Sequence, residues 1–355
     1  MRPSMGRHRP RTARASRALR FGRPLVLAAT VLLVAAGGSG IAAAGTAPAL
    51  QPVMLPRDHG AHPGFNVEWW YTAGTLADAT GRDYFWFATI WSTGTALVSR
   101  LNVVDLTADR IVLSSEFVSS TPVVSGQTQL AVGGLHLGWR PGGAWGRWSV
   151  DGSAGTGGLL DLSLLPRQPY VLNGPHGIIE QGPGGQSAYY SNPRLAARGT
   201  LELNGKKLKV SGQGWLDHQW GNFATQIGSL RWNWFACQFQ DGRDLMLYQF
   251  LNPDDSPSSV YSGTLVSRHG AVTHPGQFTA VPLGPSIRPA GATATYPLRW
   301  RLEVPSGKIV ITLRARARNQ FITNKYVPSF WEGAASITSG STGTCIVEST
   351  REGGT

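Results

Sequence analysis

Residues 214–221, with the sequence Gly-Trp-Leu-Asp-His-Gln-Trp-Gly, place a carboxylate, an imidazole and two indoles close together. Plain strands and loops rarely need such a density of proton-transferring and apolar groups, and functional sites often do. An apolar setting raises the pKa of a carboxyl group, which can then protonate a carbon–carbon double bond, and indole faces stabilise the cation that forms. We therefore expect Asp217 and His218 to be catalytic residues.

Neighbouring side chains of an extended strand point to opposite faces, so only one of this pair should reach a ligand directly. His218 shares its face with Trp220. We predict that His218 faces the pocket as proton donor or water-orienting group, and that Asp217 supports it from behind. The flanking glycines would allow a local bulge. Two structural alternatives stay open: Asp217 caps a turn, or His218 is simply a hydrogen-bonded core residue.

Acids beside aromatic residues recur along the chain, first at Glu68-Trp69-Trp70-Tyr71. Alternation places Trp69 and Tyr71 on one face of a strand and Glu68 and Trp70 on the other. The third expected catalytic residue is Tyr248. The expected ligand-binding residues are Glu68, Trp69, Trp70, Tyr190, Trp220, Trp232, Trp234 and Trp331. Large aromatic residues dominate protein cores, so each tryptophan has core packing as its alternative role.

The composition favours an all-β protein. Glycine (45), proline (23) and tryptophan (13) are abundant among the 355 residues, and apolar residues at helical spacing are almost missing. Asn204-Gly205 and Asp241-Gly242 each separate two strand-like segments and predict hairpins. The length suggests two domains. The polar tail from Ser339 is expected to fray.

The N-terminal residues predict export. Eight arginines and no acid precede residue 25, so the net charge of +12 leaves only +4 for the rest of the chain. An apolar run, Leu25 to Ala36, follows and has the form of a secretory signal, with cleavage expected near Ala44 or Ala49. The alternative is an uncleaved membrane anchor. We expect a secreted or periplasmic protein that binds no nucleic acid, because its basic residues do not interleave with aromatic ones.

Other chemistries lack their usual patterns. The mature chain has no Gly-x-Ser-x-Gly motif for a serine hydrolase. His59, His62 and Glu68 could surround a metal, but their spacing in a proline-containing loop is a weak signal, so neither a metal nor a cofactor is expected. Cys237 and Cys345 could form a disulfide in an oxidising compartment, and the sequence leaves open whether they pair.

Five motifs occur together in a fixed order: residues 68–71, Tyr189-Tyr190 followed by Arg194-Leu195, residues 214–221, residues 245–248 and residues 331–334. In this combination the chain resembles the lipocalin-like family of carotenoid 1,2-hydratases, fungal kievitone hydratase, fungal Diels–Alderases and bacterial AttH-like exported proteins. The resemblance spans residues 58 to 350. It implies two consecutive lipocalin-like (calycin-type) antiparallel β-barrel domains, residues 50–225 and 226–355, behind an N-terminal segment 1–49, with a ligand pocket lined from both.

The resemblance also implies a function. It suggests a cofactor-free lyase or isomerase that acts on an apolar, isoprenoid- or polyketide-like olefin, for example as a hydratase. Carotenoid hydratases carry an aspartate after the tyrosine matched by Tyr248, where this chain has Gln249. The alternative function is a non-catalytic carrier of an apolar ligand, since a barrel of this size can hold one small molecule without chemistry. A carrier would keep binding after Asp217→Asn and His218→Gln, and would return its ligand unchanged.

Overall fold

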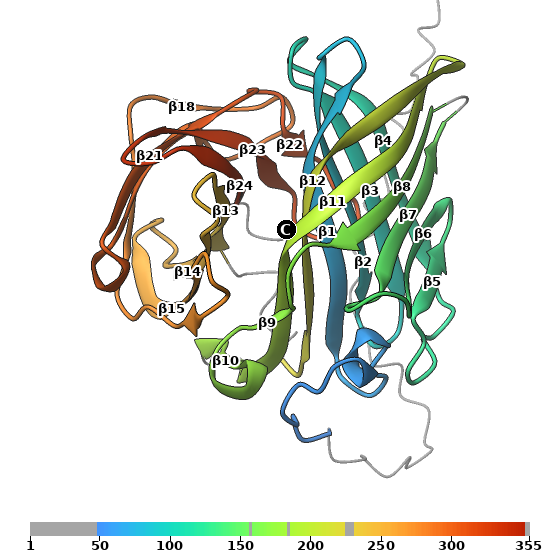
Figure 1. The fold of residues 1–355 in the computed structure, drawn as a ribbon, viewed down its shortest axis with the longest axis horizontal. Coiled ribbons are helices and arrows are strands. Elements are labelled where there is room, and N and C mark those ends of the chain that lie inside the picture. Colours follow the sequence, from blue (N-terminus) through green and yellow to red (C-terminus); the bar gives the residue numbers. More distant parts are fainter. Residues whose placement is uncertain (1–47, 156–157, 183–184, 224–230, 352–355) are drawn as a thin grey trace, which may run out of the picture. The chain divides into compact units, whose positions relative to one another are not determined.

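The computed structural model describes residues 48–155, 158–182, 185–223 and 231–351, which belong to one compact unit. Almost all of its regular structure is β-strand (Figure 1). Three short 3₁₀ turns lie wholly within the described residues: η1 (Arg57–His59), η2 (Pro175–Gly177) and η5 (Pro305–Gly307). The predicted all-β class is therefore confirmed.

Three of the sequence expectations concern segments that lie outside these residues. They are the apolar run from Leu25 to Ala36, the cleavage site near Ala44 and the domain boundary between residues 225 and 226. Within the described ranges, no helix has the length and the apolar character needed to cross a bilayer.

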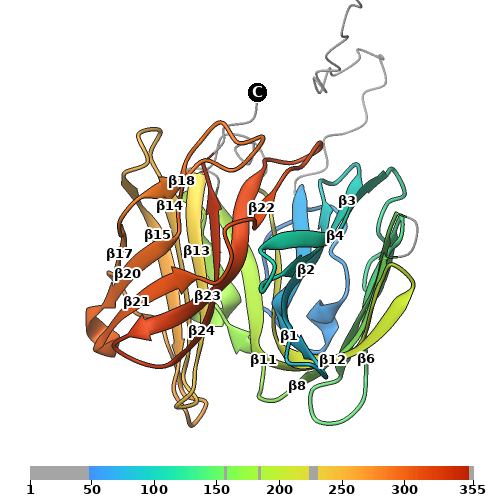
Figure 2. The same ribbon diagram turned by 90° about the horizontal axis from the view of Figure 1, so that it is seen from above.

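The first sheet curls into a nearly closed barrel (Figure 2). Its antiparallel neighbours follow the order β4-β3-β2-β1-β12-β11-β8-β7-β6-β5, and the short strands β9 and β10 add to β11. The strands are β1 (Val67–Asp78), β2 (Asp83–Ser92), β3 (Leu97–Asp105), β4 (Arg110–Ser119), β5 (Gln129–Val132), β6 (Leu135–Arg140), β7 (Arg147–Ala154), β8 (Gly158–Pro166), β9 (Val171–Leu172), β10 (Ile178–Glu180), β11 (Gln186–Leu203) and β12 (Lys206–Gly221).

The long hairpin of β11 and β12 supplies the wall on which the candidate residues lie. Its two-residue turn is Asn204-Gly205, and both residues have positive φ (51° and 75°), as a type I′ turn requires. The predicted hairpin is therefore confirmed, and β12 runs from it without a break into residues 214–221.

The second sheet is a half-barrel in the order β16-β15-β14-β13-β24-β23-β21-β20-β17, with β22 beside β23 and a separate pair of β18 and β19. Its strands are β13 (Arg231–Phe239), β14 (Asp244–Leu251), β15 (Pro257–Val266), β16 (Val272–Thr273), β17 (Thr279–Pro282), β18 (Ser286–Ile287), β19 (Tyr296–Pro297), β20 (Arg299–Val304), β21 (Ile309–Ala315), β22 (Phe321–Ile322), β23 (Phe330–Ser339) and β24 (Gly343–Thr350). The hairpin predicted at Asp241-Gly242 joins β13 and β14. Together the two sheets confirm the expected pair of lipocalin-like barrels.

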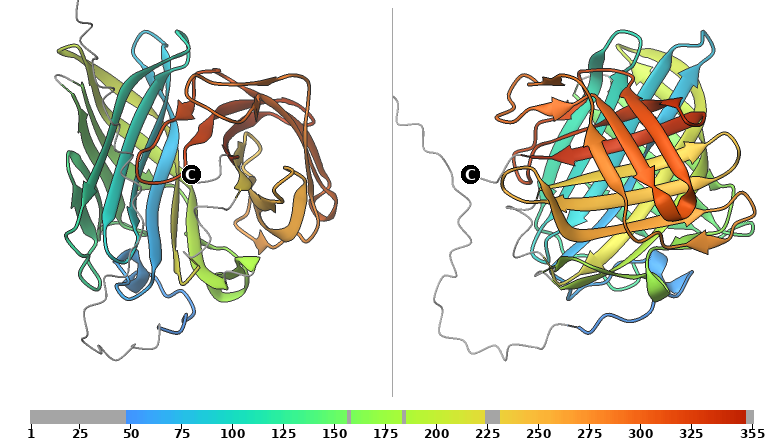
Figure 3. Two further views of the ribbon diagram at one scale, coloured as in Figure 1. Left: turned by 180° about the vertical axis from the view of Figure 1, so that it is seen from behind. Right: turned by 90° about the vertical axis from the view of Figure 1, so that its left-hand side faces the viewer.

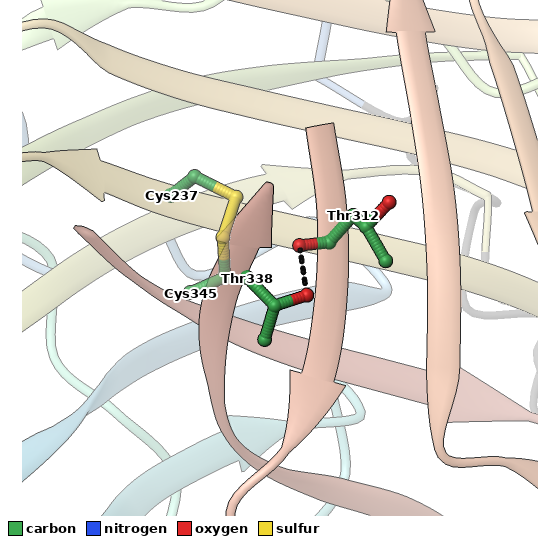
Figure 4. The surroundings of a disulfide bond; sticks show 4 residues. All are labelled: Cys237, Thr312, Thr338 and Cys345. Atoms are coloured by element: carbon green, nitrogen blue, oxygen red, sulfur yellow. Dashed lines mark hydrogen bonds between the residues drawn. A yellow bond between two sulfur atoms is a disulfide. The ribbon is translucent and has the colours of Figure 1, made fainter. Parts of the chain in front are cut away.

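The expected fraying of the tail from Ser339 is wrong. Residues 343–350 form β24, which pairs with both β13 and β23 at the centre of the second sheet. Cys345 lies directly opposite Cys237 of β13, and the two form a disulfide (Figure 4). Beside it, the Thr338 hydroxyl donates a hydrogen bond to the Thr312 carbonyl at 3.2 Å. The tail is thus tied into the sheet by pairing on both sides and by a covalent bond.

The two sheets lie side by side and share a third apolar cluster (Figure 3). One core fills the first barrel and another fills the second sheet. The shared cluster joins residues of β1, β2, β11 and β12 to residues of β13, β14, β23 and β24. An ion pair also links the sheets, because Arg194 of β11 lies 2.9 Å from the Asp244 carboxylate of β14.

Candidate active site between the two sheets

The pairing of β12 with its neighbours decides which side chains share a face. Asp217 lies opposite Tyr71 of β1 and Ser191 of β11, whereas His218 lies opposite Trp70 and Tyr190. The pairing of β1 with β12 has no register shift, so alternation holds throughout residues 214–221. One face looks into the first barrel, and the other looks toward the second sheet.

A cavity of about 180 Å³ lies on the face toward the second sheet. It is lined mainly by aromatic rings from both sheets, among them Trp69, Tyr71, Phe87, Trp91, Tyr189, Trp232, Trp234, Tyr248, Phe250 and Phe330. Two carboxyl groups also line it, Asp217 from the first sheet and Glu348 from the second. An apolar cavity with a few converging polar groups is the usual form of a ligand site.

Asp217 is buried and held by three donors. The Tyr189 hydroxyl donates to Oδ2 at 2.6 Å, and Oδ1 accepts from the Ser191 hydroxyl at 2.5 Å and the Trp215 indole at 2.7 Å. Burial raises the pKa of Asp217 to about 6, although these three hydrogen bonds oppose the rise. At neutral pH the carboxylate is therefore mostly ionised, yet close enough to its pKa to accept and return a proton.

Glu348 has a different environment. It is half-buried, and its carboxylate accepts a hydrogen bond from the Trp232 indole at 2.5 Å. Burial raises the pKa of Glu348 to about 7, with a smaller contribution from the charge of Asp217. Its directly opposite neighbour on β23 is Glu332, which is fully buried and accepts a hydrogen bond from the Tyr71 hydroxyl. Burial and the Glu348 charge raise the pKa of Glu332 far above its ordinary value, so this pair retains a proton at neutral pH.

The predicted orientation of the Asp-His pair is reversed in the structure. Asp217 lines the cavity, whereas His218 is fully buried on the other face of β12, inside the first barrel. There its Nε2 lies 2.8 Å from Glu68 Oε1 and its Nδ1 lies 3.1 Å from the Tyr190 hydroxyl. The reversal arises because the second sheet covers the odd-numbered face of β12, the face that carries Trp215.

The other predicted site residues divide in the same way. Five of the predicted residues line the cavity: Asp217, Tyr248, Trp69, Trp232 and Trp234. The remaining six do not: Glu68, Trp70, Tyr190, His218 and Trp220 face the interior of the first barrel, and Trp331 lies in the core of the second sheet. For Trp70, Trp220 and Trp331, core packing is thus the structural role. The predicted separation of Trp69 and Tyr71 from Glu68 and Trp70 is confirmed.

Tyr248 lines the cavity with its ring, but its hydroxyl donates to the Glu180 carbonyl of β10. Burial raises its pKa above the ordinary value for a phenol, which makes it a weaker acid. The same contact fixes the segment around residues 173–182, from which Gln181 also lines the cavity. The role of Tyr248 is therefore to form part of the cavity wall rather than to transfer a proton.

Sequence reasoning missed several residues of this site. Tyr189, Ser191 and Trp215 donate hydrogen bonds to Asp217. Strand alternation could have identified Trp215, because it lies two residues before Asp217 on the same face of β12. Glu348 had a weaker signal, an acid that follows the short apolar run Cys345 to Val347. Its importance depends on the pairing of β24 with β13 and β23, which local sequence does not reveal.

Comparisons with known proteins agree with this fold. A crystal structure of an AttH protein from Nitrosomonas europaea is 24% identical, with a TM-score of 0.76, and the match covers 85% of this chain and 97% of that one. Kievitone hydratase from Nectria haematococca is 18% identical, with a TM-score of 0.64, and the match covers 86% and 94% of the two chains. At these identities the two structures establish likeness of fold.

A sequence relative is also known by its activity. Dehydratase asqC of Emericella nidulans is 23% identical over 175 residues, which are 47% of this chain. The match spans about half (49%) of that protein's length. The profile of the AttH-like family matches residues 46–350, which include both sheets. The chain therefore belongs to the AttH-like family.

Proposed function

We propose that this protein is a cofactor-free lyase that adds water to, or removes it from, a carbon–carbon double bond of an apolar ligand. The observation that carries the proposal is the pair of carboxyl groups, Asp217 and Glu348, that enter one aromatic cavity from opposite sheets. Their pKa values are about 6 and about 7, so at a pH between these values Asp217 is mostly ionised and Glu348 is mostly protonated. Such a pair suits general acid–base catalysis.

The environments of the two groups assign their roles. Three donors favour the ionised form of Asp217, which acts as the base. Glu348 has one donor and a pKa raised to about 7, so it holds a proton at neutral pH more readily than Asp217 does and acts as the acid. The aromatic rings of Trp69, Trp232 and Trp234 line the same cavity and stabilise a transient carbocation.

In hydration, Glu348 gives its proton to one alkene carbon, and the electron pair of the double bond forms the new carbon–hydrogen bond. The neighbouring carbon becomes cationic, and the oxygen of a water molecule bonds to it while Asp217 takes the proton that this water releases. In dehydration the same steps run backwards: Asp217 protonates the leaving hydroxyl and Glu348 removes the carbon-bound proton. No oxidant, reductant or metal is required in either direction.

The relatives support this class of reaction. One is a dehydratase and another a hydratase, so both carry names for removal or addition of water. The cavity also fits an apolar group of modest size, because an engineered cavity of about 150 Å³ in another protein binds benzene. An isoprenoid- or polyketide-like ligand would place its reacting olefin there.

A non-catalytic carrier is the second candidate, favoured by the largely aromatic lining of the cavity. The two candidates differ in the fate of the ligand. Mass spectrometry of the molecule that co-purifies with the native protein identifies the ligand. Both candidates predict that Asp217→Asn and Glu348→Gln still bind it, and only the lyase predicts a product that differs by one water. Recovery of the unchanged ligand after prolonged incubation with wild-type protein would favour the carrier.

We also propose that the protein is exported to a secreted or periplasmic location. The Cys237–Cys345 disulfide supports this, because disulfides persist mainly in oxidising compartments. The arginine-rich start and the apolar run up to Ala36 support it as well.

A further inference from the structure

A polar cluster in the first barrel has no part in the proposed reaction. Glu68 of β1 lies at its centre, on the face of the sheet opposite the cavity. Its Oε1 atom lies 2.7 Å from His62 Nδ1 and 2.8 Å from His218 Nε2. One ligand atom from each of these three side chains lies within 4.8 Å of the other two.

The burial of this cluster calls for an explanation. Glu68 is 2% exposed and His218 is fully buried. A buried carboxylate is costly unless it is paired and hydrogen-bonded, and here it converges with two imidazoles rather than with one long basic side chain. Two imidazoles and one carboxylate form the donor set of several zinc sites.

The outer ring nitrogens of both histidines have acceptors of the kind that surround metal sites. His62 Nε2 lies 3.5 Å from Asp58 Oδ1, and His218 Nδ1 lies 3.1 Å from the Tyr190 hydroxyl. Histidines that bind metals usually donate their second ring N–H to a carboxylate or another oxygen, which fixes the tautomer and the ring orientation. Asp58 is itself held by the Met54 backbone N–H at 2.7 Å.

Two indoles hold the imidazole rings in place. Trp220 stacks on His62, with ring centroids 3.9 Å apart and planes 7° from parallel. Trp70 stacks on His218 at 4.8 Å and 27°. The rings are therefore oriented before any ligand arrives. The His62 side chain is 19% exposed, which gives an ion a route from solvent.

We propose that His62 Nδ1, His218 Nε2 and the Glu68 carboxylate bind a divalent transition-metal ion, of which Zn²⁺ fits this donor set best. The three ligands come from the segment before β1, from β1 and from β12. The ion would thus tie the N-terminal lead-in to the barrel wall. Ligand atoms around a tetrahedral ion with bonds of about 2.1 Å lie about 3.4 Å apart, so binding requires each nitrogen to move away from Glu68 by about 0.6 Å.

The test is a metal titration of tag-free, chelator-treated full-length protein. Calorimetry with Zn²⁺ should give one ion per chain. Co²⁺ in the same site should give the visible absorption bands of tetrahedral coordination. His62→Gln and Glu68→Gln should each weaken Zn²⁺ binding by at least about 100-fold, since each removes one of three ligands. His136→Gln, an exposed histidine of β6, is the matched control and should bind as the wild type does.

Thermal unfolding supplies a second readout. Added Zn²⁺ should raise the melting temperature of the wild type and of His136→Gln, and should leave that of His62→Gln unchanged. His62 is only partly buried, so this variant carries the test if Glu68→Gln fails to fold. Equal Zn²⁺ binding by His62→Gln and the wild type would overturn the proposal, as would the absence of saturable binding to the wild type. Ligand binding in the cavity is measured separately and does not bear on this outcome.

Discussion

Glu348→Gln tests the electrostatics of the cavity without any substrate. The folded-state pKa of Glu348, about 7, lies above its ordinary value of 4.5. The folded chain therefore keeps a proton that the unfolded chain releases, and stability falls as pH rises from about 4.5 through about 7. A pKa shift of this size corresponds to about 3 kcal/mol in the free energy of unfolding. Because Glu348 is half-buried, screening by solvent weakens the effect, and we expect about 2 kcal/mol.

Glutamine has the shape of a protonated glutamate but does not titrate. At about pH 4.5 the variant and the wild type should have the same free energy of unfolding. Between about pH 4.5 and about pH 7.5, the free energy of unfolding of the variant should fall by about 2 kcal/mol less than that of the wild type. Urea denaturation followed by tryptophan fluorescence measures both values. Glu202→Gln, in the β11–β12 hairpin, is the matched control and should follow the wild type. An equal fall in wild type and Glu348→Gln would refute the raised pKa of Glu348 in the folded chain.

Two further predictions concern packing and export. Trp70→Ala should lower the free energy of unfolding by about 3–5 kcal/mol because Trp70 is fully buried in the barrel core. Trp69→Ala should destabilise less and should reduce the quenching of tryptophan fluorescence by an apolar ligand, and an equal reduction in Trp70→Ala would contradict this division. N-terminal sequencing of the exported protein should begin near Gly45 or Leu50, and recovery of the full-length chain in membranes would indicate an anchor instead.

Local signals in the sequence were sufficient for much of the fold. Asn204-Gly205 predicted its hairpin because a type I′ turn needs two residues with positive φ. Alternation separated Trp69 from Trp70 because successive side chains of a strand point to opposite faces of the sheet. The five-motif combination predicted the two barrels, which the structure contains.

Contacts between distant segments decided the rest. Alternation separated Asp217 from His218, but only the position of the second sheet decides which of them meets the cavity. The tail from Ser339 is largely polar, and the place of Glu348 at the centre of a sheet follows from pairing with β13, more than 100 residues earlier in the chain. The same pairing brings Cys237 opposite Cys345, which sequence left open.

The most direct test of the proposed lyase activity follows oxygen exchange between water and the ligand that co-purifies with the protein. In heavy-oxygen water, the wild type should incorporate the label into a ligand hydroxyl through reversible hydration. Asp217→Asn and Glu348→Gln should each slow incorporation by about 10²–10⁴-fold while still binding the ligand. His218→Gln, which alters the far face of β12, should keep incorporation within about tenfold of the wild type provided that it folds. Exchange that survives in both carboxyl variants, or that disappears only in His218→Gln, would contradict the assignment of Asp217 and Glu348 as the acid–base pair.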